Sequence, residues 1–133
     1  MPTTKTPMES DRLIGDAEVI AIRFDGGDLQ IDIVNPGPTE NKANLLTFSK
    51  VEFFQFCGQS VLILERIEAY DGVEQALEVP SIAQILKNRE LLDEMSFGHL
   101  RFSDWPVYRL VPLAGSESFV ICSTATIGEW RTV

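Results

Sequence analysis

Residues 17–34, AEVIAIRFDGGDLQIDIV, constrain the fold most strongly because they predict a β-hairpin in a defined register. Gly26 and Gly27 can both take the positive φ of a type I′ turn, so we expect them to form a two-residue loop. That loop sets three apolar pairs opposite each other: Phe24 with Leu29, Ile22 with Ile31, and Ile20 with Ile33. All six side chains are predicted to be buried on one face, with Arg23 and Gln30 on the other. A lone hairpin is marginally stable, so this apolar face requires a larger sheet or a helix to cover it.

The rest of the sequence predicts an α+β fold of mostly antiparallel sheet, with about six to eight strands packed against one main amphipathic helix. The helix is expected over residues 82–95, with Ser81 as its N-cap. Its apolar stripe comprises Ile82, Ile85, Leu86, Leu92 and Met95. Further strands are expected at residues 43–56 (with a bulge at 49–50), 61–69, 107–113 (with Pro112 at an edge or bulge), 118–124 and 127–132.

Composition and charge predict one soluble domain that does not bind nucleic acid. Residues 1–10 are polar and rich in Pro and Thr, so they are expected to form a flexible tail before a single domain at 11–133. The net charge of −9 argues against nucleic acid, whose phosphates would have to be neutralised by Lys and Arg, and equally against an anionic membrane surface. The sequence has no apolar signal region and no apolar run long enough to cross a membrane, so a cytoplasmic location is expected.

The sequence lacks a recognisable catalytic or metal-binding constellation. The common phosphate-binding, hydrolase and zincin motifs are absent, and the single histidine, His99, offers no cluster of metal ligands. Cys57 and Cys122 both lie in apolar, strand-like runs, which favours buried free thiols over reactive ones. We therefore expect no cofactor, no metal and no enzymatic activity.

Two features favour a surface that binds another protein. Negative charge is concentrated between residues 65 and 78 against the single Arg66, and aromatic side chains lie beside acidic ones near residue 105. Trp and Tyr are enriched among binding hot spots, although they are also common in cores, and most acidic runs are simply solvated. The candidate partner-binding residues are Glu65, Glu68, Asp71, Glu74, Trp105 and Tyr108.

The order of elements resembles a group of small β-rich bacterial domains. The resemblance rests on residues 10–16 (SDRLIGD) before the hairpin, 46–54 (LTFSKVEFF), the tyrosine-bearing strand 107–110 (VYRL) and the closing strand 119–122 (FVIC). These domains include uncharacterised families and some immunity proteins of polymorphic toxin systems. The resemblance implies a non-enzymatic protein that binds and blocks a toxin domain, and the acidity suits a basic toxin. The alternative is a small housekeeping domain that acts as a homo-oligomer, such as a homodimer.

Overall fold

The computed structural model describes residues 9, 11–56, 61–89 and 104–133 as an antiparallel sheet with few helices. Its elements are η1 (Arg12–Ile14), β1 (Glu18–Asp25), β2 (Asp28–Pro36), β3 (Asn41–Gln55), β4 (Leu62–Tyr70), α2 (Val73–Ala76), α3 (Pro80–Asn88), β5 (Val107–Ala114), β6 (Ser118–Ile127) and β7 (Arg131–Thr132). The predicted α+β class and antiparallel sheet are confirmed. No helix among the described residues is both long and apolar enough to cross a membrane.

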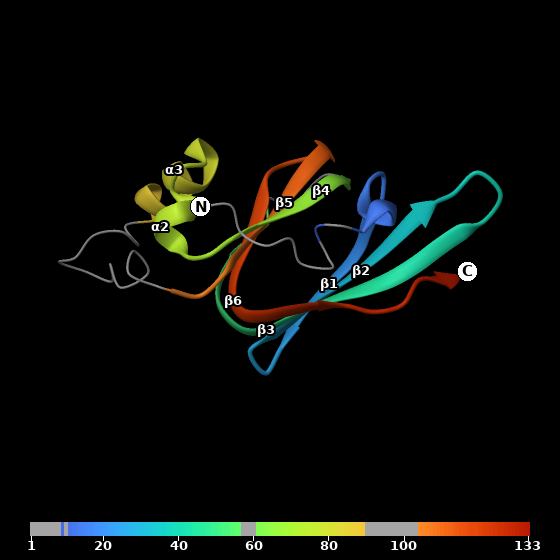
Figure 1. Ribbon diagram of the computed structural model, residues 1–133, viewed down its shortest axis with the longest axis horizontal. Coiled ribbons are helices and arrows are strands. Elements are labelled where there is room, and N and C mark those ends of the chain that lie inside the picture. The colour runs from blue at the N-terminus through green and yellow to red at the C-terminus, as the bar shows by residue number, and fades with distance from the viewer. Residues whose placement is uncertain (1–8, 10, 57–60, 90–103) are drawn as a thin grey trace.

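Seven strands form one sheet, in the order β2-β1-β4-β5-β6-β3-β7 (Figure 1). Strand β3 also pairs with β2, so β1 to β6 close into a six-stranded ring. The seam between β1 and β4 is short, because only Glu18 with Ile63 and Val19 with Leu62 are paired across it. Beyond Val19, β1 keeps β2 as a neighbour on one side, and none of the described strands pairs with its other side.

Two apolar cores lie on opposite sides of this curved sheet. The interior core is centred on the inward side chains of β2, β3, β5 and β6, which include Leu29, Ile31, Phe48, Tyr108 and Val120. The exterior core lies where α2 and α3 cover β5 and β6, and it includes Val73, Ile82, Leu86, Val107 and Phe119. Figure 1 shows both helices at one end of the sheet, with the connection between β2 and β3 at the other end. The first half of β6, residues 118–122, contributes to both cores and is therefore buried throughout and apolar after the serine.

The hairpin register is confirmed around the turn and wrong farther from it. Gly26 and Gly27 have φ of 62° and 86°, and Phe24 lies opposite Leu29 and Ile22 opposite Ile31, as predicted. Ile33, however, lies opposite Val19 instead of Ile20, because a bulge between Val19 and Ala21 shifts the register by one residue. The bulge predicted at residues 49–50 lies farther along β3, where the register with β6 shifts between Val51 and Phe53, although Lys50 itself has a φ of 54°. A bulge around Pro112 occurs as predicted.

The prediction that all six hairpin side chains are buried is also wrong. Leu29, Ile31 and Ile33 on β2 are fully buried, whereas Ile20, Ile22 and Phe24 on β1 are 58%, 42% and 52% exposed. The physical reason is the short seam, since a side chain on β1 loses the cover of a neighbouring strand once β4 has turned away.

The prediction of one main amphipathic helix over 82–95 is not confirmed in that form. The helix α3 covers Pro80–Asn88, with Ile82 and Leu86 fully buried, and the predicted residues Leu92 and Met95 lie outside the described part of the chain. Ser81 is not the N-cap, because Pro80 occupies the first turn and the capping position belongs to Val79. Proline is well suited to the first helical position, where its missing N–H leaves no bond unmade.

Candidate functional site

The predicted acidic residues lie along β4 and the turn that follows it, and the two on β4 are engaged by arginine. Glu65 and Glu68 flank Arg66, and both form ion pairs with its guanidinium; Glu68 Oε2 lies 2.8 Å from Arg66 Nε. Asp71 lies in the turn after β4, where its backbone N–H donates to Gln75 Oε1 at 2.6 Å. Glu74 lies in the first turn of α2 and is exposed, like Asp71.

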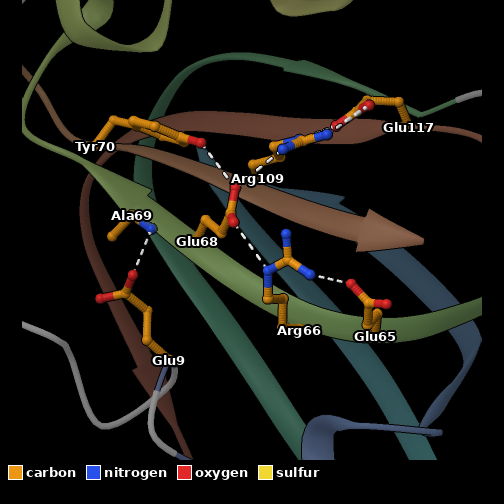
Figure 2. A network of polar contacts seen from close by, with 8 residues as sticks. All are labelled: Glu9, Glu65, Arg66, Glu68, Ala69, Tyr70, Arg109 and Glu117. Carbon is orange, nitrogen blue, oxygen red and sulfur yellow. Dashed lines mark hydrogen bonds and ion pairs between the residues drawn. The ribbon is translucent and has the colours of Figure 1, made fainter. Parts of the chain in front are cut away.

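Glu68 is the centre of a larger polar network on the outer face of the sheet (Figure 2). The register of β4 and β5 places Glu68 directly opposite Arg109, whose Nη1 donates to Glu68 Oε1 at 3.0 Å. The Tyr70 hydroxyl donates to the same oxygen at 2.8 Å. Arg109 also binds both carboxylate oxygens of Glu117, which makes this pair bidentate. Because three carboxylates share two guanidiniums, most of the charge concentrated on β4 is compensated within the protein.

The network shifts the pKa values of its members. Burial alone raises the pKa of Glu68, but hydrogen bonds from Tyr70, Arg66 and Arg109 outweigh it and lower the net pKa below the ordinary value. Burial, followed by the hydrogen bond to Glu68, raises the pKa of Tyr70. The hydrogen bond to Glu117 raises the pKa of Arg109 despite partial burial. Glu68 is therefore ionised and Arg109 charged at neutral pH.

Replacement of Glu68 by Gln is expected to lower the free energy of unfolding at pH 7 by about 1 kcal/mol. A carboxyl group whose pKa is lowered by folding contributes stability above its ordinary pKa, and this contribution is lost as the pH falls through the folded value. The difference between wild type and Glu68→Gln should therefore shrink in urea titrations performed below pH 4.5, the ordinary value for Glu. The control is Glu65→Gln, on a half-exposed side chain bound to Arg66. A difference of the same size at pH 3 and pH 7 would contradict this role for the Glu68 carboxylate.

The two aromatic candidates lie in different environments. Trp105 is 37% exposed and precedes β5. Tyr108 is 6% exposed, with its ring centroid 5.7 Å from that of Phe48 inside the barrel. Tyr108 therefore belongs to the interior core, and its ring does not form part of a surface with the acidic residues.

The nucleophile candidates give no catalytic arrangement within the described part of the chain. Cys122 is fully buried in the barrel, where its thiol contacts the Thr124 carbonyl oxygen at 3.4 Å, and burial raises its pKa to about 12. Cys57 and His99 lie outside the described residues. Among the residues that are described, no group of three His, Cys, Asp or Glu side chains could hold a metal ion.

In a Cys57→Ser variant, the remaining thiol is expected to react with a disulfide reagent at least about 1000-fold more slowly than a model peptide at pH 8. At pH 8 the raised pKa of Cys122 lowers the fraction of the thiol present as thiolate by about that factor, and burial limits the access of the reagent further. Addition of guanidinium chloride should restore the ordinary rate, which separates protection by the fold from chemical blockage. A native-state rate near that of the peptide would contradict the buried position.

The surface that the sequence did not predict is the outer edge of β1. We define the β1 edge as the backbone of residues 20–25 together with the side chains of Ile20, Ile22 and Phe24. Ile22 and Phe24 share a face with Ile31 and Leu29, because directly opposed residues of an antiparallel pair point the same way. They therefore point toward the barrel core, yet they remain about half exposed because no described strand lies beside them.

No described strand pairs with the outward backbone groups of the β1 edge. In a two-residue hairpin, the residues that flank the loop exchange hydrogen bonds, and the ladder bonds then recur at every second residue. Asp25 and Arg23 therefore bond to β2, whereas the N–H and C=O groups of Ile22 and Phe24 point to the outer edge. Across the seam, part of the corresponding edge of β4 is covered, since the Ala69 N–H donates to Glu9 Oε1 at 2.9 Å (Figure 2).

At the end nearest the turn, the β1 edge packs against aromatic side chains of β3 and the residue that follows it. The Phe24 ring centroid lies 5.1 Å from that of Phe54, and Phe54 lies 6.0 Å from Phe56. The outward face of β1 is polar instead, with Arg23 ion-paired to Asp32 of β2. The β1 edge is thus apolar on one face and charged on the other, with a row of hydrogen-bonding groups between them.

Among the described residues, the fold and this surface define a small antiparallel β-barrel in which the outer edge of β1 is unpaired beyond Val19. Comparisons with protein-family models, curated proteins and solved structures found no match for the chain.

Proposed function

We propose that the protein is a non-enzymatic binding protein that holds its protein partner at the β1 edge. The observation that carries the proposal is the exposure of Ile22 and Phe24 on the core-facing side of a strand whose outer backbone groups are unpaired among the described residues. Such an edge is a template for another strand, and natural proteins usually cover or interrupt it. Addition of a strand would satisfy the backbone groups and bury the apolar side chains together.

The chemistry of the titratable groups supports binding over catalysis. The Cys122 thiol is buried with a raised pKa, and Glu68 is held by three donors, so neither is poised to attack or to transfer a proton. The cytoplasmic location predicted from the sequence belongs to the same proposal.

If the partner is a different protein, the negative charge of this chain favours a basic one. The chain carries a net charge of −9, and exposed Glu18, Asp25 and Asp28 lie near the two ends of the β1 edge. The resemblance to immunity proteins makes a basic toxin domain the specific form of such a partner. The structure supports the acidic cluster on β4 less well as a contact surface, because Arg66 and Arg109 compensate it.

Selection from a library of displayed twelve-residue peptides tests binding at the β1 edge without knowledge of the partner. Peptides that bind wild type are expected to alternate apolar and polar residues, to carry Lys or Arg, and to lose binding to Ile22→Lys. Their association should slow as salt rises from about 50 to about 500 mM, because the Debye length falls to a few ångströms. Selected peptides that bind Ile22→Lys as tightly as wild type would overturn the proposal.

A second candidate is the homo-oligomer that the sequence left as the alternative. The specific observation in its favour is the spacing of the apolar residues of β1, because Ile20 and Phe24 lie two positions on either side of Ile22. An open apolar edge of this kind can be closed by a symmetry-related copy.

A further inference from the structure

We propose that a second copy of this chain occupies the β1 edge, with the two β1 strands antiparallel and Ile22 on the two-fold axis. This inference rests on the proposed binding at the β1 edge and names a second copy as the occupant, in place of the basic partner that net charge alone favours. The dimer would join two β2–β1 hairpins into a continuous four-stranded sheet. Backbone geometry permits this register, and side-chain chemistry selects it.

The outward backbone groups fit a two-fold axis at Ile22. The N–H and C=O of Ile22 point to the free edge, so two copies of Ile22 can exchange both hydrogen bonds as a directly opposed pair. The next outward groups, at Phe24, then face Ile20 of the second copy. An axis at Ala21 or Arg23 would use the same outward groups in neighbouring pairs, so the backbone permits those registers as well and the side chains decide among them.

The central row of the apolar face is continuous in this register. Ile22 lies opposite Ile31 within one chain, so the central row of the joined sheet reads Ile31, Ile22, Ile22 of the second copy and Ile31 of the second copy. In the next row, Phe24 lies opposite Ile20 of the second copy, which the bulge between Val19 and Ala21 leaves without a partner on β2. The half-exposed Ile22 is thereby covered by its own counterpart, which is the arrangement that an isologous interface requires.

The polar face is complementary as well. Arg23 lies opposite Ala21 of the second copy, and beyond that small side chain lies Asp32 of the second copy. Arg23 and Asp32 of the second copy are separated by two inter-strand spacings, about 10 Å in all. The two side chains together are long enough to meet above the alanine that lies between them. Each Arg23, already paired with its own Asp32, thus meets a second carboxylate. An axis at Arg23 would set the two arginines directly opposite each other.

Sedimentation velocity over about 1 to 500 μM protein tests the dimer. Wild type is expected to shift from one to two chain masses, whereas Ile22→Lys should weaken dimerisation at least about 100-fold because two lysines meet on the axis. The control is Leu113→Lys, since Leu113 is 55% exposed on β5 and should leave the dimer unchanged. Arg23→Asp should weaken the dimer, and the exchanged pair Arg23→Asp with Asp32→Arg should restore it. Circular dichroism melting of each variant shows that folding is retained.

The dependence of binding on salt concentration distinguishes a second copy from a basic partner. Two chains of −9 repel at long range, so dimerisation should strengthen between about 50 and 500 mM salt, whereas a basic partner would bind more weakly. Wild type that stays monomeric throughout overturns this inference, and so does Ile22→Lys that dimerises as tightly as wild type. If monomeric wild type still binds peptides that Ile22→Lys does not bind, the second copy is excluded and binding at the β1 edge stands. If those peptides bind both proteins equally, the proposed function fails as well.

Discussion

Replacement of Leu86 by Asp is expected to lower the free energy of unfolding by about 4 kcal/mol or more. Leu86 is fully buried in the exterior core, where α3 contacts the apolar outer face of β5 and β6. The substitution removes a large apolar side chain and introduces a carboxylate into an apolar cluster without a cationic partner. Small domains have total stabilities of about 5–15 kcal/mol, so much of the cooperative unfolding transition should be lost.

The matched control is Lys87→Asp, one residue farther along the same helix. Lys87 is exposed, and its replacement should change the stability by less than about 1 kcal/mol, mostly through the helix dipole at this last turn. Urea titration monitored by circular dichroism compares the two variants directly. Equal and small effects would show that α3 does not cover the sheet.

Replacement of Ile31 by Ala is expected to cost about 2–5 kcal/mol, whereas Ile22→Ala should cost less than about 1 kcal/mol. The two residues are directly opposed on neighbouring strands and differ by their surroundings, since Ile31 is fully buried and Ile22 is 42% exposed. From the sequence, both replacements were expected to be equally costly. Chemical denaturation at low protein concentration measures the monomer and avoids any contribution from a dimer.

The pair of variants is a sharp test because the chemical change is identical. Comparable losses at both positions would mean that Ile22 is covered in the monomer, and the β1 edge would then not be open. A small loss at Ile31 would instead contradict the closed interior of the barrel.

The hairpin shows what local sequence can predict. The positive φ values that Gly26 and Gly27 provide set the loop, and the loop sets the register for the residues next to it. The bulge at Val19–Ala21 was not predictable from the same pattern, because it depends on how β1 reaches β4 at the seam. The prediction of burial along β1 was wrong for the same reason, since the alternation of side chains does not reveal whether a strand has a neighbour on both sides.

The polar network shows why contacts between residues far apart in the chain could not be predicted from the sequence. The clustered carboxylates on β4 were evident in the sequence, but their compensation depends on the pairing of Glu68 with Arg109, which are 41 residues apart. Tyr108 and Trp105 are close in sequence, yet one side chain lies inside the barrel and the other at the surface. That assignment requires knowledge of which face of β5 encloses the core.

Helix α3 illustrates a competition between two local preferences. The serine at position 81 suits an N-cap, but the preceding proline suits the first helical turn, and the structure begins the helix at Pro80. The apolar positions Ile82 and Leu86 were predictable from their four-residue spacing and are buried as expected.

Amide hydrogen exchange measured by NMR at two protein concentrations tests the central claim, that the outer edge of β1 is open and receives a strand. In dilute solution, the amides of Ile22 and Phe24 should exchange rapidly, while the amide of Arg23, which bonds to β2, should be protected. At high concentration, Ile22 and Phe24 should become protected as well, and Arg23 should change little. Strong protection of Ile22 and Phe24 in the most dilute sample would contradict the account, because another part of the same chain would then occupy the edge.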